Sequence, residues 1–183
     1  MSKPSVTAAL TPVLETPRLI LRETRAEDFE ACAALWGDAR VVRHIGGRVS
    51  TPSESWGRML RFPGLWALLG YGYWTMTERE TGSFAGQVGL ADFRRDLSVD
   101  ISGIPEAGWV LSPRVHGRGY ATEAMGAVLD WADRELDAPQ TCCLIDPDNA
   151  ASLNVARKLG YGGAQTAQLG DHATLVLWRG RKT

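Results

Sequence analysis

Two glycines in the second half of the chain, Gly117 and Gly119, stand between a short apolar run and a long amphipathic segment. Glycine lets the backbone approach a ligand closely and present several N–H groups together. A helix that begins directly afterwards adds unpaired N–H donors and a partial positive charge, which suit an anion. Arg114 and Arg118 add full positive charges beside the loop. This stretch therefore predicts a site for a pyrophosphate group.

Spacing alone leaves an ordinary glycine-rich turn as an equal alternative. In a dinucleotide fingerprint the third glycine would stand at position 122, which is Thr122, so that match fails. A P-loop is also excluded, because no Gly-Lys-Ser/Thr sequence follows the glycines. A dinucleotide-dependent enzyme is therefore the weakest of the interpretations that the loop allows.

The loop lies within a mixed pattern of strand-like and helix-like segments. Apolar or alternating runs predict strands at residues 18–23, 73–77, 84–91, 107–111, 141–145, 161–167 and 174–178. Apolar residues at helical spacing predict helices that begin near residues 24, 52, 119 and 150. Residues 92–105 are polar and predict a loop. The order β-α-α-β-β-β-α-β-α-β-β predicts an α+β fold, with a mixed, largely antiparallel sheet flanked by helices.

Capping residues mark where the first two helices begin. Thr24 and Glu27 form a T-x-x-E capping box ahead of the first helix. Thr51 is expected to cap the second helix, with Pro52 at its first position. Pro63 is expected to limit or interrupt this helix, because proline removes a hydrogen bond from a helix interior.

Composition indicates a folded domain without a membrane or nucleic-acid partner. The chain has 183 residues, of which 44% are hydrophobic and 22% charged, as in ordinary globular proteins. Its 20 Lys and Arg residues against 21 Asp and Glu residues give a formal charge of −1, which does not favour non-specific nucleic-acid binding. No apolar run is long enough for a transmembrane helix. The N-terminus makes a poor signal peptide, so we expect a cytoplasmic protein.

Residues 1–16 are expected to form a loosely ordered lead-in, and residues 17–180 a single domain. The three cysteines, Cys32, Cys142 and Cys143, lack the number and spacing of a disulfide scaffold or a zinc site. We therefore expect no metal.

Three blocks of sequence, in this order, resemble the GNAT N-acetyltransferase superfamily. Residues 114–119, RVHGRG, match its R/Q-x-x-G-x-G/A pyrophosphate loop, and residues 120–124 continue it. Residues 16–22, TPRLILR, resemble the opening strand of the ribosomal-protein N-terminal serine/alanine acetyltransferase branch. Asn149-x-x-Ser152, followed by KLGY at 158–161, resembles the second conserved block of that branch. The resemblance implies a GNAT fold for residues 17–180 and acetyl-CoA as the cosubstrate.

The resemblance also implies where acetyl-CoA binds, in a wedge between the fourth and fifth strands of the family. The backbone of Trp109, Val110 and Leu111 would pair with the pantetheine arm. The pyrophosphate would be held by the loop residues Arg114, Gly117, Arg118, Gly119, Tyr120 and Ala121. Asn149, which with Asp148 is one of two candidate caps of helix 150–159, would hydrogen-bond the pantetheine region. Ser152 lies three residues further, so both side chains can face the cofactor.

The implied reaction is direct transfer of an acetyl group to a primary amine, either a protein N-terminus or a small-molecule amine, with both substrates held together. An α-amine costs only about 1 kcal/mol to deprotonate at pH 7, so a modest base suffices. Glu106 is the candidate base; the alternative is a solvated residue at a strand end. Many relatives carry a tyrosine where this chain has Ala156, so Ser152 is the candidate proton donor to the thiolate. The missing tyrosine leaves a non-catalytic acyl-CoA sensor as the alternative function.

The acceptor site of the family is built from the early helices and the loop before the last strand, here about residues 39–66 and 168–173. Five basic residues in the first segment indicate either an anionic acceptor or a solvated basic helix face: Arg40, Arg43, His44, Arg58 and Arg61. Relatives are monomers or homodimers, and we expect the same here. Glu123 is interpreted as a structural residue at the start of its helix, where a negative charge suits the helix dipole.

Overall fold

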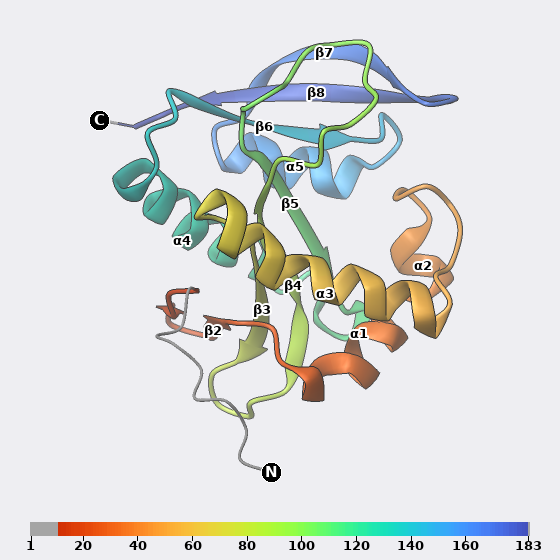
Figure 1. Cartoon of the computed structure of the whole chain (residues 1–183), viewed down its shortest axis with the longest axis vertical. Coiled ribbons are helices and arrows are strands. Elements are labelled where there is room, and N and C mark those ends of the chain that lie inside the picture. The colour runs from red at the N-terminus through yellow and green to blue at the C-terminus, as the bar shows by residue number, and fades with distance from the viewer. Residues whose placement is uncertain (1–10, 183) are drawn as a thin grey trace.

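Helices cover both faces of one eight-stranded sheet in the computed structural model, which describes residues 11–182 (Figure 1). The strand order is β1-β2-β3-β4-β5-β6-β8-β7. All neighbouring strands are antiparallel except β5 and β6. The predicted α+β fold with a mixed, largely antiparallel sheet is confirmed.

The strands are β1 (Leu14–Glu15), β2 (Leu19–Arg22), β3 (Tyr73–Glu78), β4 (Phe84–Ala91), β5 (Glu106–Leu111), β6 (Gln140–Ile145), β7 (Gly162–Leu169) and β8 (His172–Gly180). The helices are α1 (Phe29–Trp36), α2 (Ala39–Val42), α3 (Pro52–Leu69), α4 (Tyr120–Glu135) and α5 (Ala150–Lys158). Short 3-10 turns precede α1 and α4, at Ala26–Asp28 and Pro113–Val115.

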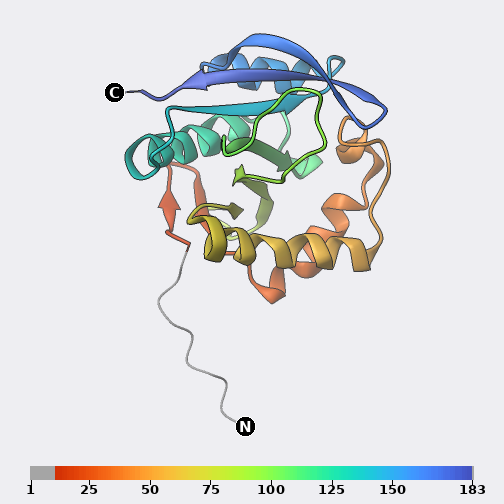
Figure 2. The same cartoon turned by 45° about the horizontal axis from the view of Figure 1, so that its top comes forward.

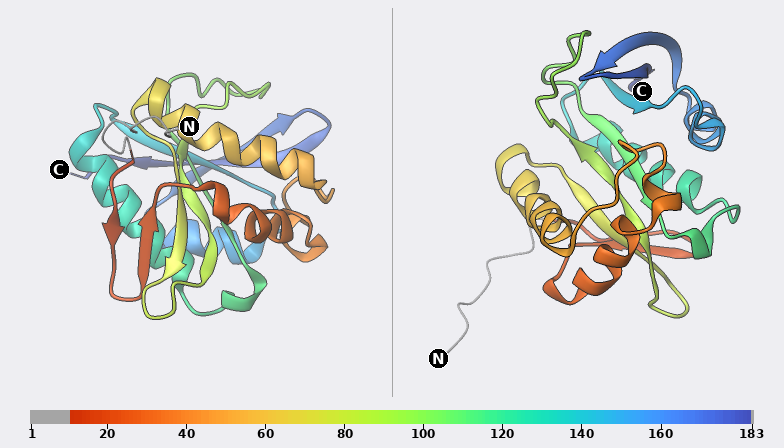
Figure 3. Two further views of the ribbon diagram at one scale, coloured as in Figure 1. Left: turned by 60° about the horizontal axis from the view of Figure 1, so that its bottom comes forward. Right: turned by 90° about the vertical axis from the view of Figure 1, so that its right-hand side faces the viewer.

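Helices α1 and α3 cover one face of the sheet, and α4 and α5 cover the other (Figure 3). Three tryptophans connect these layers: Trp66 of α3, Trp74 of β3 and Trp131 of α4 meet edge to face, with ring centroids 4.7–5.4 Å apart. All three belong to the main apolar core, which lies between α4 and the central strands. A smaller core joins α1, α2 and α3.

Helix α3 begins as predicted but runs further than expected. Thr51 and Glu54 form a reciprocal capping box at its start. The helix then passes through Pro63 to Leu69, so the predicted interruption was wrong. Proline inside a helix costs about 3 kcal/mol. Pro63 itself is exposed, and burial of Phe62 and Trp66 on the opposite face offsets that cost.

Two expectations near the N-terminus were also wrong. At the helix start after β2, the backbone N–H of Arg25 donates to the side chain of Asp28, and the expected Thr24–Glu27 capping box does not form. Asp28 also pairs with Arg22 through both carboxylate oxygens. Thr24 instead shares a hydrogen bond with Thr75 on β3. Part of the expected lead-in is also ordered, because β1 pairs with β2; residues 1–10 lie outside the described range.

The segment 92–105 is a loop, as predicted, and it packs across the C-terminal strands (Figure 2). Leu97 bridges Leu169 at the end of β7, and Ser98 exchanges two hydrogen bonds with Gln168. Ile101 is buried against the sheet. These contacts hold the middle of the loop against the C-terminal strands.

A wedge opens between β5 and β6. Strand β5 pairs with β4 along all six of its residues. It pairs with β6 only at Glu106 and Ala107, after which the two strands separate (Figure 1). The second edge of β5 is therefore free of strand pairing from Gly108 to Leu111, which leaves backbone N–H and C=O groups for another extended chain.

Candidate active site

A groove of about 650 Å³ runs along the free edge of β5. Its walls come from α2, from residues 109–111, from the loop ahead of α4 and from the first turns of α4 and α5. It contains most of the residues expected to bind the cofactor: Trp109, Val110, Leu111, Gly117, Gly119, Tyr120, Ala121, Asn149 and Ser152. The topology thus brings together residues that are up to 43 positions apart in the chain (109 to 152).

The glycine loop has the geometry of an anion site. Gly117 and Gly119 have φ angles of 75° and 77°, a conformation that side chains disfavour. Gly119 is the N-cap of α4 and supplies no side chain to satisfy the first N–H groups of the helix. These donors and the positive end of the helix face the groove. The residues present fit a pyrophosphate.

The side chains of the two loop arginines, Arg114 and Arg118, do not line the groove. Arg114 and Arg118 both pair with Glu78 at the end of β3, at 2.6 and 2.7 Å, and Tyr120 donates a hydrogen bond to the same carboxylate at 3.0 Å. The hydrogen bond from Arg114 lowers the pKa of Glu78 below its ordinary value. The arginine side chains therefore fasten the loop to the sheet, and their expected charge contribution beside the anion is offset by Glu78.

Glu123 fastens the other side of the same loop. Its carboxylate accepts hydrogen bonds from the Thr16 hydroxyl at 2.7 Å, from the Arg18 backbone at 3.0 Å and from the Arg18 side chain at 2.6 Å. Arg18 also donates to the carbonyl of Arg118. This agrees with a structural role for Glu123, and it explains why the blocks at 16–22 and 114–124 occur together.

Asn149 and Ser152 lie at the start of α5. The Asn149 side chain accepts the backbone N–H of Ser152 at 3.1 Å, so Asn149 is the helix cap. The Ser152 hydroxyl makes no hydrogen bond within residues 11–182 and is half-buried in the groove wall. Ala156, which stands where many relatives carry a tyrosine, is fully buried and packs in the main core.

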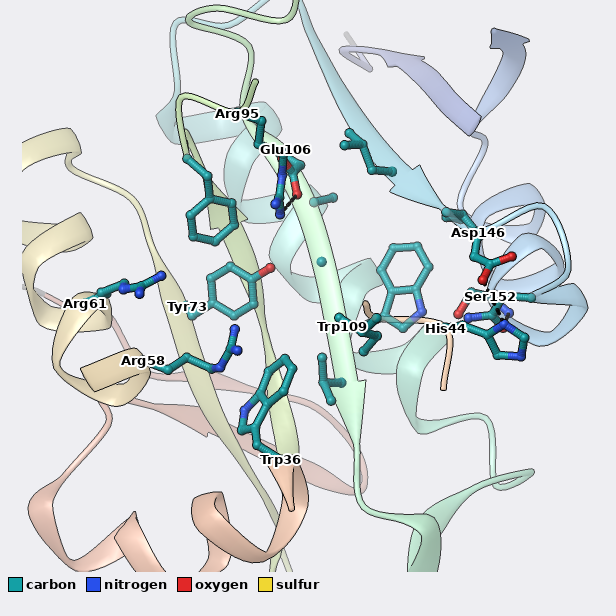
Figure 4. Close-up of a pocket in the computed structure, with 18 of the residues that line it drawn as sticks. Trp36, His44, Arg58, Arg61, Tyr73, Arg95, Glu106, Trp109, Asp146 and Ser152 are labelled. Carbon is teal, nitrogen blue, oxygen red and sulfur yellow. Dashed lines mark hydrogen bonds and ion pairs between the residues drawn. The ribbon is translucent and has the colours of Figure 1, made fainter. Parts of the chain in front are cut away.

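A second, smaller pocket of about 230 Å³ adjoins the groove (Figure 4). The two cavities share six residues, which we term the junction: His44, Ile45, Trp109, Val110, Asn149 and Ser152. The remaining walls of the pocket come mainly from α3, β3, β5 and the loop after β4. A ligand in the groove and a ligand in the pocket would therefore meet at the junction.

Glu106 lies in this pocket and is not a solvated strand-end residue. Its side chain is 6% exposed and makes a two-point ion pair with Arg95, with N–O distances of 2.6 and 2.7 Å. Burial would lower the pKa of Arg95, but the hydrogen bond with Glu106 raises it overall. Sequence reasoning missed Arg95, because no pattern in loop 92–105 indicates which side chain turns inward.

Tyr73 is a second pocket residue that sequence reasoning missed. Its ring stacks on Phe62 of α3, with centroids 4.9 Å apart. Its hydroxyl lies directly against Gly108 of β5. A Cβ at position 108 would overlap the tyrosine oxygen, so glycine is required there. Burial raises the pKa of Tyr73 well above its ordinary value, so it stays neutral.

Other candidate groups divide between the junction and the core. His44 reaches the junction and pairs with Asp146 at the end of β6, with Nδ1 and Oδ2 3.0 Å apart, whereas His172 is exposed and lines neither cavity. All three cysteines are buried, and burial raises the pKa of Cys142 to about 12, which disfavours a thiolate nucleophile. Residues 11–182 contain no cluster of three metal-ligating side chains. No helix in that range is long and apolar enough to span a membrane.

Comparisons with known proteins agree with this fold. The family model described as "Acetyltransferase (GNAT) domain" matches residues 18–162. YkkB, an uncharacterized protein of Bacillus subtilis (strain 168), is 35% identical over 99 residues, and the match covers 53% of this chain and 55% of YkkB. The crystal structure of the acetyltransferase from Agrobacterium tumefaciens str. C58 superposes with a TM-score of 0.77 at 29% identity, covering 97% of this chain and 99% of that one.

The ribosomal-protein branch is represented among the solved structures at lower similarity. A ribosomal L7/L12 alpha-N-protein acetyltransferase in complex with coenzyme A superposes with a TM-score of 0.72 at 16% identity, covering 92% of this chain and 98% of that one. Identity at this level shows a shared fold alone. The narrower resemblance to this branch stays a prediction.

Proposed function

Because the chain belongs to the GNAT acetyltransferase family, we propose that it transfers an acetyl group from acetyl-CoA to a primary amine, on a protein N-terminus or a small molecule. The observation that carries this proposal is the junction, where a long groove with an anion site at its far end meets a separate pocket. A groove of this kind suits a long anionic cosubstrate, and the pocket suits its acceptor. Holding both in contact supplies much of the rate enhancement.

The chain's own residues would bind acetyl-CoA along the groove. The free backbone edge at 109–111 would pair with the pantetheine arm as an added strand. The N–H groups from Gly117 to Ala121 would hold the pyrophosphate. Asn149 keeps its amide N–H₂ available for the pantetheine region, because only its oxygen is used in the cap. When bound, acetyl-CoA supplies the activated acetyl thioester.

Glu106 is proposed to receive the amine proton, through a water molecule. Arg95 fixes the orientation of its carboxylate, but each carboxylate oxygen retains a second lone-pair position for a water. Only a modest base is needed for an α-amine, whose deprotonation at pH 7 costs about 1 kcal/mol. A lysine side chain would cost roughly 4–5 kcal/mol, so an α-amine or another weakly basic amine is the better acceptor.

Ser152 is proposed to assist the departing sulfur. Its hydroxyl lies at the junction and is not engaged by another group among residues 11–182, so it can donate a hydrogen bond there. Ala156 favours a second candidate function, a sensor that binds acyl-CoA without turnover, because a buried alanine in the core supplies no acid. The two functions differ in whether any acetylated amine forms.

Calorimetric titration with acetyl-CoA tests the binding mode. Wild-type protein should bind saturably, and Gly119→Glu should abolish binding, since it places a negative charge and a strained side chain in the loop that would hold the pyrophosphate. Gly82→Glu is the matched control: Gly82 also has a positive φ, 69°, and open space around it, but lies in the β3–β4 turn outside both cavities. Equal loss in both variants, or none in either, would contradict the assigned pyrophosphate site.

A further inference from the structure

The smaller pocket holds more positive charge than its own carboxylates neutralise. Its ionisable lining residues include two carboxylates, and each of these is already paired, Glu106 with Arg95 and Asp146 with His44. Two further cations, Arg58 and Arg61, line the same pocket on the α3 side (Figure 4). Neither of them has a carboxylate within ion-pair distance among residues 11–182. The pocket therefore contains two uncompensated guanidinium groups.

The guanidinium group of Arg58 packs on an aromatic ring and has no acidic partner among residues 11–182. Its guanidinium carbon lies 3.7 Å from the ring centre of Trp36. The Trp36 indole N–H donates to the fully buried Gln87 at 3.0 Å, which fixes the ring. The Arg58 Nε atom is buried without a hydrogen-bond partner. Because Nε is closed to solvent, a carboxylate in the pocket would be bound by the terminal N–H₂ groups of Arg58, which lines the pocket.

Arg58 and Arg61 are three residues apart on α3, so they share one face of the helix. Like charges at this spacing destabilise a helix. Burial and the neighbouring Arg61 charge both lower the pKa of Arg58. The nearest acidic residue on the preceding turn, Glu54, is committed to Arg48 and to the Thr51 cap. The fold thus retains a repulsive pair at the pocket wall that an anion would stabilise.

The other walls of the pocket are largely apolar and aromatic. Phe62, Tyr73 and Phe93 line the pocket together with the arginines, and Trp109 lines it at the junction. An acceptor that reaches from the arginines to the junction would therefore present an anionic group at one end, an apolar body in between and its amine at the other end. A carboxylate matches the planar fork of an arginine with two hydrogen bonds.

On this basis, and resting on the proposed acetyl transfer, we infer that the acceptor is an amine whose carboxylate is separated from the amine by an apolar body, such as an apolar dipeptide, with Arg58 and Arg61 binding the carboxylate. The structure also separates the basic residues that the sequence groups together. Arg40 is paired with Asp38, and Arg43 lines neither cavity. Only Arg58 and Arg61 of the arginines in this group line the pocket.

The test compares apolar dipeptides with their C-terminal amides as acceptors. For each pair, kcat/KM is measured in wild-type protein and in Arg58→Gln, Arg61→Gln and the control Arg43→Gln. Amide formation also changes the pKa of the amine, but that effect cancels when the carboxylate-to-amide ratio is compared between variants. A charged hydrogen bond contributes about 10- to 100-fold. The ratio should fall by that factor in the two pocket variants and stay unchanged in the control.

A binding measurement tests the proposed carboxylate site without requiring turnover. The N-acetylated dipeptide, which is the expected product, is titrated into wild-type protein saturated with CoA and into each variant. Wild type and Arg43→Gln should bind it, and Arg61→Gln, whose side chain is exposed and whose loss should not affect folding, should bind it more weakly. Efficient acetylation of amides, polyamines or aminophosphonates in preference to the dipeptides would overturn the inference and leave acetyl transfer intact. Acetyl-CoA binding without any acetylated amine would overturn both.

Discussion

The proposed acid–base chemistry rests on two side chains that line the smaller pocket, Glu106 and Ser152. Glu106 is fixed by Arg95 at the closed end of the wedge, where β5 still pairs with β6. Ser152 stands at the junction, on the first turn of α5. Their separation suits two distinct steps, proton removal from the amine and hydrogen bonding to the sulfur, and each step can be tested by one substitution.

Replacing Glu106 by glutamine should lower kcat without weakening acetyl-CoA binding. The variant keeps the shape of the side chain but removes the proton acceptor, and general base catalysis contributes about 100-fold or more. The deficit should shrink as the pH rises through the pKa of the acceptor amine, about 8 for an α-amine, because the free amine then needs no base. Steady-state rates between neutral and alkaline pH measure this. A deficit that is constant across that range would mean that Glu106 only positions other groups.

Replacing Ser152 by alanine should lower kcat while the KM for the amine stays close to that of wild type. We expect a loss of about 10- to 100-fold, the size of one charge-assisted hydrogen bond that forms as the thiolate leaves. The Asn149 cap uses the backbone N–H of residue 152, so the helix start should survive the change. Unchanged kcat in this variant would show that the thiolate departs without help from Ser152.

At the scale of elements, Glu78 connects the sheet to the glycine loop. One carboxylate at the end of β3 receives Arg114, Arg118 and Tyr120, which lie 36 to 42 positions later in the chain. Glu78→Gln should therefore weaken acetyl-CoA binding by about tenfold and leave the rate at saturation unchanged, since a less ordered loop raises the cost of binding. Calorimetry measures the change, with the exposed Glu80→Gln as the control.

The same contact predicts a pH dependence. The pKa of Glu78 is lowered in the folded protein, so its fastening of the loop is fully present above the ordinary glutamate range and is lost only as the pH falls through the lowered pKa. The affinity difference between wild type and Glu78→Gln should accordingly be constant near neutral pH and shrink under acid conditions. A difference that grows as the pH falls would contradict this assignment.

A second contact between elements stabilises the fold. Arg179 of β8, whose side chain is 3% exposed, pairs with Asp133 of α4 through both oxygens. Asp133→Asn would leave a buried guanidinium without its charge partner, which costs about 3 kcal/mol. Denaturant unfolding measures this, with the exposed Asp130→Asn on the same helix as the control. Equal stabilities of the two variants would contradict the importance of the pair.

Local sequence patterns predicted most elements but not the contacts between them. Strands β2 to β8 and α4 follow from periodicity within a few residues, and Asn149 is one of the two caps that the sequence allowed for α5. Helix α3 continues through Pro63 because burial of Phe62 and Trp66 offsets the cost of a proline inside the helix. A local sequence pattern does not include this tertiary burial. The glycine loop and Asn149-x-x-Ser152 are contiguous motifs, so they could be recognised. Arg95, Tyr73 and Glu78 act through partners on other elements, and no local signal marks them.

At the scale of the whole molecule, the sheet assembles three distant blocks around one groove. Residues 16–18 hold Glu123 and the loop from one side, and α5 completes the opposite wall. Acetyl-CoA would therefore contact elements from both halves of the chain. At a concentration 100 times its Kd, it should raise the free energy of unfolding by about 2.7 kcal/mol. Gly119→Glu should lose this stabilisation and Gly82→Glu should retain it; a ligand that stabilises neither protein would contradict the wedge as a binding site.

One measurement tests acetyl transfer at the junction most directly. Wild-type protein is incubated with acetyl-CoA and a panel of amines that includes apolar dipeptides, while released thiol and acetylated product are quantified together. Acetyl transfer predicts that thiol and acetylated amine form in equal amounts, and that Glu106→Gln slows both. Saturable acetyl-CoA binding with no acetylated product from any amine would contradict it and identify the protein as a sensor.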